Sequence, residues 1–106
     1  MESVLIASAV RTPIGKFGGS LSHLTAADLG VIAVKEALKR AGIEPEAVNE
    51  TIIGHARQAG NGPNVARQIS YRSGIPKESS AYTVNKACGS GLKAILLACQ
   101  IGRAHV

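Results

Sequence analysis

Cys88 is the residue of this chain best suited to covalent chemistry. It lies in the motif Asn85-Lys86-Ala87-Cys88-Gly89-Ser90-Gly91-Leu92-Lys93-Ala94. A thiolate is the nucleophilic form of cysteine, and the positive charges of Lys86 and Lys93 favour that form. Because Gly89 and Gly91 carry no Cβ, a substrate carbonyl can approach the sulfur and the backbone amides together. The motif therefore predicts a nucleophilic cysteine built for acyl transfer.

The elements that position Cys88 are predicted to be a strand before it and a helix after it. Residues 81–84 are rich in β-formers, and residues 92–98 form an apolar, helix-forming run. The first four amides of a helix lack internal partners and carry the positive end of the helix dipole. A thiol in or just before the first helical turn therefore loses its proton more easily, and the nearby amides are candidates for an oxyanion hole.

A structural role is the competing interpretation of Cys88, because free cysteine usually packs as a small buried hydrophobe. Glycines on both sides of a helix start argue against it, since a core cysteine gains nothing from uncrowded neighbours. Cys99 lies eleven residues further on. On one helix that separation is about 16 Å, whereas a disulfide needs Cα atoms within about 7 Å. We therefore interpret Cys99 as a buried helix residue.

The motif around Cys88 resembles the nucleophile motif of the thiolases, the acetyl-CoA C-acetyltransferases. Two further segments resemble thiolase signatures, in the order and spacing of the family. They are Ser8-Ala9-Val10-Arg11-Thr12-Pro13-Ile14-Gly15-Lys16-Phe17-Gly18-Gly19, and Gln58-Ala59-Gly60-Asn61-Gly62 followed by Asn64-Val65-Ala66-Arg67-Gln68. The resemblance extends from residue 3 to about residue 100, and it identifies the chain as an N-terminal fragment of a thiolase.

The resemblance implies a Claisen condensation and its reverse, the thiolysis of a 3-ketoacyl-CoA. Cys88 matches the nucleophile that forms the acyl-thioester intermediate, and its backbone amide matches an oxyanion-hole donor. Coenzyme A thioesters are then substrates, no cofactor is implied, and the parent enzyme is expected to be a homodimer or homotetramer. The family's histidine base and second cysteine have no match here, because His23, His55 and His105 lie in unrelated contexts. We expect this chain alone to be inactive.

The expected fold is α/β, an incomplete thiolase-type N-terminal domain with the order βαβαβα and a mainly parallel sheet. Residues 4–7 are a continuous apolar run, typical of a strand buried on both faces. Thr25 and Asp28 form a capping-box pattern for the first helix, and Gly42 suits the left-handed position that ends it. The remaining predicted strands are residues 51–54 and 81–84, and a helix from about Asn64 to Arg72 lies between them.

His55 directly follows the predicted strand at residues 51–54, at the end of the sheet where α/β proteins bind ligands. Nothing in the sequence pairs it with Cys88, so a structural role is favoured. Residues 1–100 are expected to form the partial domain. Residues 101–106 are expected to be a non-native tail, because Ile101-Gly102-Arg103-Ala104-His105-Val106 matches the in-frame translation of a common sequencing adapter.

The net charge of +5 invites a nucleic-acid interpretation, which the distribution of the charges argues against. The 12 Lys and Arg residues are scattered singly, and only three aromatic residues are present for base stacking. No apolar run approaches the length of a membrane span, and no zinc-ligand spacing occurs. We expect a cytoplasmic protein that binds neither nucleic acid nor membrane nor metal.

Two alternatives to acyl transfer stay open. Gly89-Ser90-Gly91 followed by Ala94 satisfies the spacing of a dinucleotide-binding turn, although the acidic residue expected about twenty positions later is missing. The other alternative is a non-catalytic interaction fragment. An incomplete parallel sheet leaves edges and apolar faces uncovered, so such a piece should aggregate or need partners.

Overall fold

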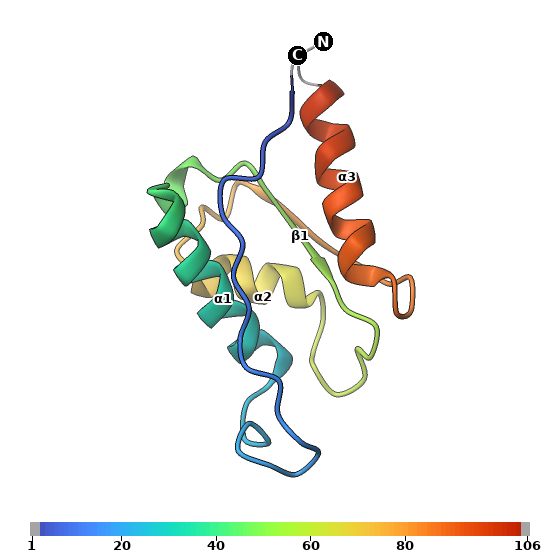
Figure 1. The fold of residues 1–106 in the computed structure, drawn as a ribbon. Coiled ribbons are helices and arrows are strands. Elements are labelled where there is room, and N and C mark those ends of the chain that lie inside the picture. Colours follow the sequence, from blue (N-terminus) through green and yellow to red (C-terminus); the bar gives the residue numbers. More distant parts are fainter. Residues whose placement is uncertain (1–2, 105–106) are drawn as a thin grey trace.

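Within residues 3–104, which the computed structural model describes, two parallel strands and three α-helices build the fold. The elements are α1 (Ala26–Ala41), the short 3-10 helix η1 (Pro45–Ala47), β1 (Glu50–Gly54), α2 (Val65–Arg72), β2 (Ser80–Val84) and α3 (Ser90–Ala104). The helices α1 and α2 lie on one side of the strands and α3 on the other (Figure 1). The sheet thus has helices on both faces, as parallel sheets require.

β1 and β2 pair in parallel, with Thr51 opposite Ala81 and Gly54 opposite Val84. Parallel neighbours need a crossover connection, and α2 provides it while packing on both strands. This pairing confirms the predicted α/β class and the two predicted strands at residues 51–54 and 81–84. Because the carboxyl ends of both strands lie at the same end of the sheet, the loops that follow them meet there.

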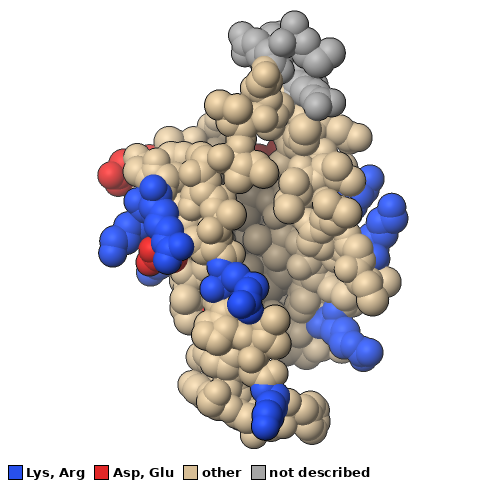
Figure 2. All heavy atoms as spheres, viewed as in Figure 1, with Lys and Arg blue, Asp and Glu red and all other residues tan. Residues whose placement is uncertain are grey.

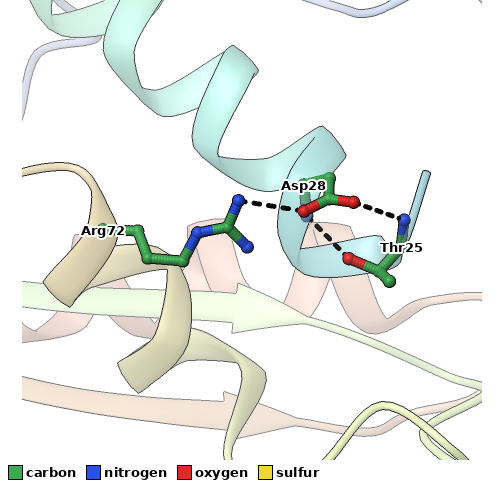
Figure 3. Close-up of polar contacts among 3 residues, drawn as sticks. All are labelled: Thr25, Asp28 and Arg72. Atoms are coloured by element: carbon green, nitrogen blue, oxygen red, sulfur yellow. Dashed lines mark hydrogen bonds and ion pairs between the residues drawn. The ribbon is translucent and has the colours of Figure 1, made fainter.

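The first helix begins and ends where the sequence predicts. The Asp28 amide donates to Thr25 Oγ1 at 3.1 Å, and the Thr25 amide donates to Asp28 Oδ2 at 2.9 Å, which closes the capping box (Figure 3). Gly42 ends α1 with a left-handed φ of 68°. Arg72 of α2 donates to Asp28 Oδ1 at 2.9 Å, so the cap of α1 also ties it to α2.

Acidification is expected to remove the stabilisation that Asp28 contributes. Hydrogen bonds from the Thr25 backbone and from Arg72 hold the pKa of the Asp28 carboxyl below its ordinary value. A carboxyl whose folded-state pKa is lowered stabilises the fold above its unfolded pKa of about 4, and this contribution disappears as pH falls through the folded pKa. The melting temperatures of the wild type and of Asp28→Asn should therefore differ at neutral pH and converge in acid. A gap that persists in strong acid would contradict this origin.

The core lies between α1 and α2. Ala27 and Val31 of α1 pack against Val65 and Ile69 of α2, and Ile69 is 2% exposed. Gly30 allows the close approach of the two helices, because a Cβ there would lie 2.2 Å from Cδ1 of Ile69. The crossover helix is thereby fixed between α1 and the sheet.

The predicted strand at residues 4–7 is wrong, since the described segment before α1 contains no strand. Leu5 and Ile6 are 83% and 81% exposed. Within residues 3–104, no backbone hydrogen bond joins residues 3–15 to another part of the chain. A strand needs a neighbouring strand to satisfy its amides and carbonyls, and this segment has none. The predicted order βαβαβα is therefore observed without its first strand.

An apolar groove follows the edge of β1 that does not pair with β2. It has a volume of about 790 Å³ and is lined by Val34 and Leu38 of α1, Ile52 of β1, and Ala94 and Ile95 of α3. Figure 2 shows it as a hollow between the side of the molecule that carries α1 and the side that carries α3. The groove leaves one edge of the sheet without a strand in the described part of the chain, as the incomplete-sheet prediction implies.

Other predictions concern helix ends, charge and membrane insertion. Asn64 caps α2 by accepting from the Arg67 amide, so this helix begins about where the sequence predicts. The basic side chains on the face shown in Figure 2 lie in several separate groups. No helix among the described residues is long and apolar enough to cross a membrane. Residues 101–104 of the predicted tail continue α3, and His105 and Val106 lie outside the described residues.

Candidate active site

Cys88 lies in the turn between β2 and α3, and its side chain is exposed. α3 begins at Ser90, so the sulfur belongs to the second residue before the helix. This position agrees with the predicted place in or just before the first helical turn. The strand end and the helix start therefore present the thiol to solvent at the carboxyl end of the sheet.

Asn85 organises the beginning of this turn. Its Nδ2 donates to the Ala56 carbonyl at 3.0 Å, which links the turn to the loop after β1. Its Oδ1 accepts from the Ala87 amide at 3.0 Å. Asparagine side chains commonly bond the backbone two residues on, and they thereby hold a turn without strand or helix partners.

Ser90 organises the end of the turn. Its Oγ accepts from the Lys86 amide at 2.8 Å and donates to the Ala87 carbonyl at 2.7 Å. The Gly89 amide donates to the Lys86 carbonyl at 2.9 Å, which closes the turn once more. The segment that carries Cys88 is consequently bonded at both of its ends.

Ala87, immediately before Cys88, adopts a left-handed backbone conformation with φ of 47°. A side chain with a Cβ is disfavoured there, because the Cβ comes close to the following carbonyl oxygen. Such a residue persists only where surrounding contacts hold it. The bonds from Asn85 and Ser90 to Ala87 supply those contacts.

Three amides around the sulfur have no acceptor among residues 3–104. They belong to Cys88 itself and to Gly91 and Leu92 in the first turn of α3. Unpaired amides at a helix start are the usual donors to anions and to developing oxyanions. The turn thus combines an exposed thiol with unpaired backbone N–H donors, and acyl transfer to a cysteine requires both kinds of group.

Gly54 lets α3 approach the end of β1. A Cβ on Gly54 would lie 2.4 Å from both the carbonyl carbon and the oxygen of Ser90, and 2.6 Å from the Gly91 nitrogen. Backbone atoms cannot move aside as a flexible side chain can. The absence of a side chain on Gly54 therefore determines how closely the helix start, and with it the Cys88 turn, lies on the sheet.

Some of the other residues discussed in the sequence analysis lie near the Cys88 turn and some do not. Lys86 lies in the turn itself, and Lys93 lies near the start of α3. His55 follows β1, and its amide donates to the Val84 carbonyl, so the carboxyl end of the sheet brings it beside the start of the turn. His23 lies before α1, and Cys99 is half-buried in α3. Among residues 3–104 no group of three or more His, Cys, Asp or Glu is placed to hold a metal.

Sequence reasoning missed the roles of Asn85, Ser90 and Gly54. Asn85 carries a usable signal, since asparagine before a turn predicts a bond to the backbone two residues later. Ser90 carries a weaker one, because a serine at a helix start usually indicates a cap on the helix amides. Gly54 at the end of a strand indicates a close backbone approach, but the approaching segment follows only from the fold.

Residues 4–104 match the family described as the thiolase N-terminal domain. The chain belongs to this family. The thiolase resemblance inferred from the Cys88 motif and its two companion segments is therefore confirmed.

Individual relatives agree with the family assignment. An acetyl-CoA acetyltransferase from Cupriavidus necator is 52% identical over 98 residues, which cover 92% of this chain and 25% of that protein. One from Clostridioides difficile is 50% identical over 93 residues, covering 88% of this chain and 87% of that protein. A crystal structure of a thiolase from Ascaris suum in complex with coenzyme A superposes with a TM-score of 0.96 at 48% identity, covering 97% of this chain and 27% of that one.

The chain spans about a quarter of the length of the Cupriavidus relative and of the Ascaris thiolase. The match includes all of the described elements, because it runs from residue 4 to residue 104. The described residues, including the turn between β2 and α3, therefore have the fold of the corresponding part of the Ascaris thiolase.

Proposed function

We propose that this chain is the nucleophile-bearing part of a thiolase-type acyltransferase, which moves acetyl or acyl groups between coenzyme A thioesters. The observation that carries the proposal is the exposed Cys88 thiol, two residues before α3, in a chain of the thiolase N-terminal domain family. The relatives named acetyl-CoA acetyltransferases and the thiolase solved with coenzyme A support this substrate class.

In the proposed reaction the Cys88 thiolate attacks the thioester carbonyl of an acyl-CoA. The carbonyl oxygen gains negative charge in the tetrahedral intermediate. The unpaired amide of Cys88, which belongs to the same residue as the attacking sulfur, is the proposed donor to this oxygen. The intermediate collapses, the C–S bond to coenzyme A breaks, and coenzyme A leaves as a thiolate that takes up a proton. The acyl group then remains on the sulfur of Cys88 as a thioester.

In the second half-reaction an acetyl-CoA loses a proton from its acetyl group to a base, and the resulting carbanion attacks the acyl-thioester. A carbon–carbon bond forms, the C–S bond to Cys88 breaks, and the Cys88 thiolate is regenerated. In the reverse direction Cys88 attacks the keto carbonyl of a 3-ketoacyl-CoA, the carbon–carbon bond breaks to release acetyl-CoA, and coenzyme A then takes the acyl group from the sulfur. The histidine base and the second cysteine that the thiolase resemblance implies have no match in this chain, because His23, His55 and His105 lie in unrelated contexts. We therefore propose that the 106-residue chain accepts an acyl group but does not complete turnover.

The same proposal extends to the environment of the parent enzyme. Coenzyme A thioesters act as substrates, and no cofactor takes part. The parent enzyme works as a homodimer or homotetramer in the cytoplasm, without nucleic-acid or membrane partners. Size measurement and localisation of the full-length enzyme test these points.

Incubation of the 106-residue chain with acetyl-CoA is expected to give one acetyl adduct on Cys88. Exposure and the free amides of the turn favour Cys88 over the half-buried Cys99. Peptide mass spectrometry locates the adduct, with Cys88→Ser and Cys99→Ser as a matched pair of variants. The adduct should disappear in Cys88→Ser and persist in Cys99→Ser. Equal labelling of the two cysteines would contradict the proposal.

A further inference from the structure

The Ser90 hydroxyl has no part in the chemistry proposed above, yet it is buried and fully bonded. Ser90 is 4% exposed, and its Oγ accepts from the Lys86 amide at 2.8 Å. The same Oγ donates to the Ala87 carbonyl at 2.7 Å. Both bonds go back into the turn that carries Cys88.

This arrangement differs from an ordinary helix cap. A capping serine accepts from amides two or three residues further into its helix. Ser90 Oγ instead accepts from an amide four residues earlier, and the Gly91 and Leu92 amides have no acceptor among residues 3–104. The hydroxyl therefore stabilises the turn and leaves the helix amides free.

The residue held by these bonds is Ala87. Its amide donates to Asn85 Oδ1 at 3.0 Å, and its carbonyl accepts from Ser90 Oγ and from the Ser90 amide. Ala87 needs such restraint, because its φ of 47° is unfavourable for a residue with a Cβ. The next peptide unit contains the Cys88 amide, so the conformation of Ala87 determines where that amide points.

We infer that Ser90 is a positioning residue for the acylation of Cys88. By holding Ala87 in its left-handed conformation, the hydroxyl directs the Cys88 amide and the Cys88 sulfur toward one and the same thioester carbonyl. The inference rests on the proposed function, since it concerns how an acyl group reaches Cys88. Asn85 shares the task from the other side of Ala87.

The test compares two reactions of one thiol in the 106-residue chain. Acylation of Cys88 by acetyl-CoA needs the thiolate and a placed amide, whereas alkylation by iodoacetamide needs only the thiolate. Both rate constants scale with the thiolate fraction, so their ratio cancels any change in ionisation. Mass spectrometry measures both rates at Cys88, in a Cys99→Ser background.

Ser90→Ala is expected to lower the ratio of acylation to alkylation by about tenfold to a hundredfold, the range associated with small misplacement of reacting groups. Ser79→Ala is the matched control. Its hydroxyl donates to the Pro76 carbonyl at 3.0 Å in another turn, and its loss should leave the ratio unchanged. An unchanged ratio in Ser90→Ala, with normal acylation of the wild type, overturns the positioning role and leaves the proposed function standing.

Two further results keep the test decisive. If the wild type is not acylated at all, the proposed function fails first. If Ser90→Ala no longer melts cooperatively, Asn85→Ala replaces it, because Asn85 is exposed and binds Ala87 from the opposite side. A lowered ratio in a folded Asn85→Ala supports the restraint of Ala87, and an unchanged ratio overturns it.

Discussion

Gly54→Ala is expected to destabilise the fold by about 3 kcal/mol or more. The new Cβ would lie 2.4 Å from the carbonyl carbon and oxygen of Ser90, a separation that real Cβ atoms do not tolerate. The clash is with backbone, so either α3 must retreat from β1 or the end of the strand must bend. Because α3 contacts β1 more extensively than it contacts β2, its retreat also removes buried area between α3 and the sheet. Urea denaturation of the wild type and the variant measures the loss.

Gly91→Ala is the matched control for this change, since it makes the same substitution in the first turn of α3. A Cβ there meets no atom within 4 Å. Alanine is the better helix former, so this variant should keep its stability or gain up to about 1 kcal/mol. If Gly54→Ala and Gly91→Ala were equally stable, the close approach of β1 to α3 would have to be abandoned.

Ile69→Ala is expected to cost about 2 to 5 kcal/mol, the range for emptying a core position. Ile69 is 2% exposed and packs against Ala27, Val31 and Val65. Its Cδ1 also lies beside Gly30 of α1, close to the place that a Cβ on Gly30 would take. The unfolding free energy from urea denaturation is the measurement.

Ile32→Ala provides the comparison for Ile69→Ala. Ile32 lies on α1 but is 53% exposed, so its loss should change stability by less than about 0.5 kcal/mol. A similar loss for both variants would mean that the exposed face of α1 is covered in solution. A loss confined to Ile69→Ala locates the core between α1 and α2.

Much of the fold was predictable because local signals decide it. The capping box at Thr25, the left-handed Gly42 and the β-rich residues 81–84 each specify an element without long-range information. The run at residues 4–7 failed for the opposite reason. Its apolar character indicates a segment suited to burial on both faces. It forms a β-strand only if another strand pairs with it, and the local sequence does not show whether such a partner is present.

The candidate site divides in the same way. The position of Cys88 between a strand and a helix was predictable, because both elements have local sequence signals. The restraint of Ala87 was not, since its left-handed φ follows from two side-chain bonds whose geometry the sequence does not contain. The contact of Gly54 with Ser90 joins segments 36 residues apart, and it exists only once the sheet has placed them together.

The packing of α1 on α2 couples these two helices during local opening. α1 reaches the sheet mainly through α2, whereas α2 and α3 each contact both strands. Detachment of α1 would expose Val65 and Ile69 of the core to water, so we expect α1 and α2 to open together rather than one before the other. The frame around Cys88 is therefore supported by a helix that does not itself contact the Cys88 turn.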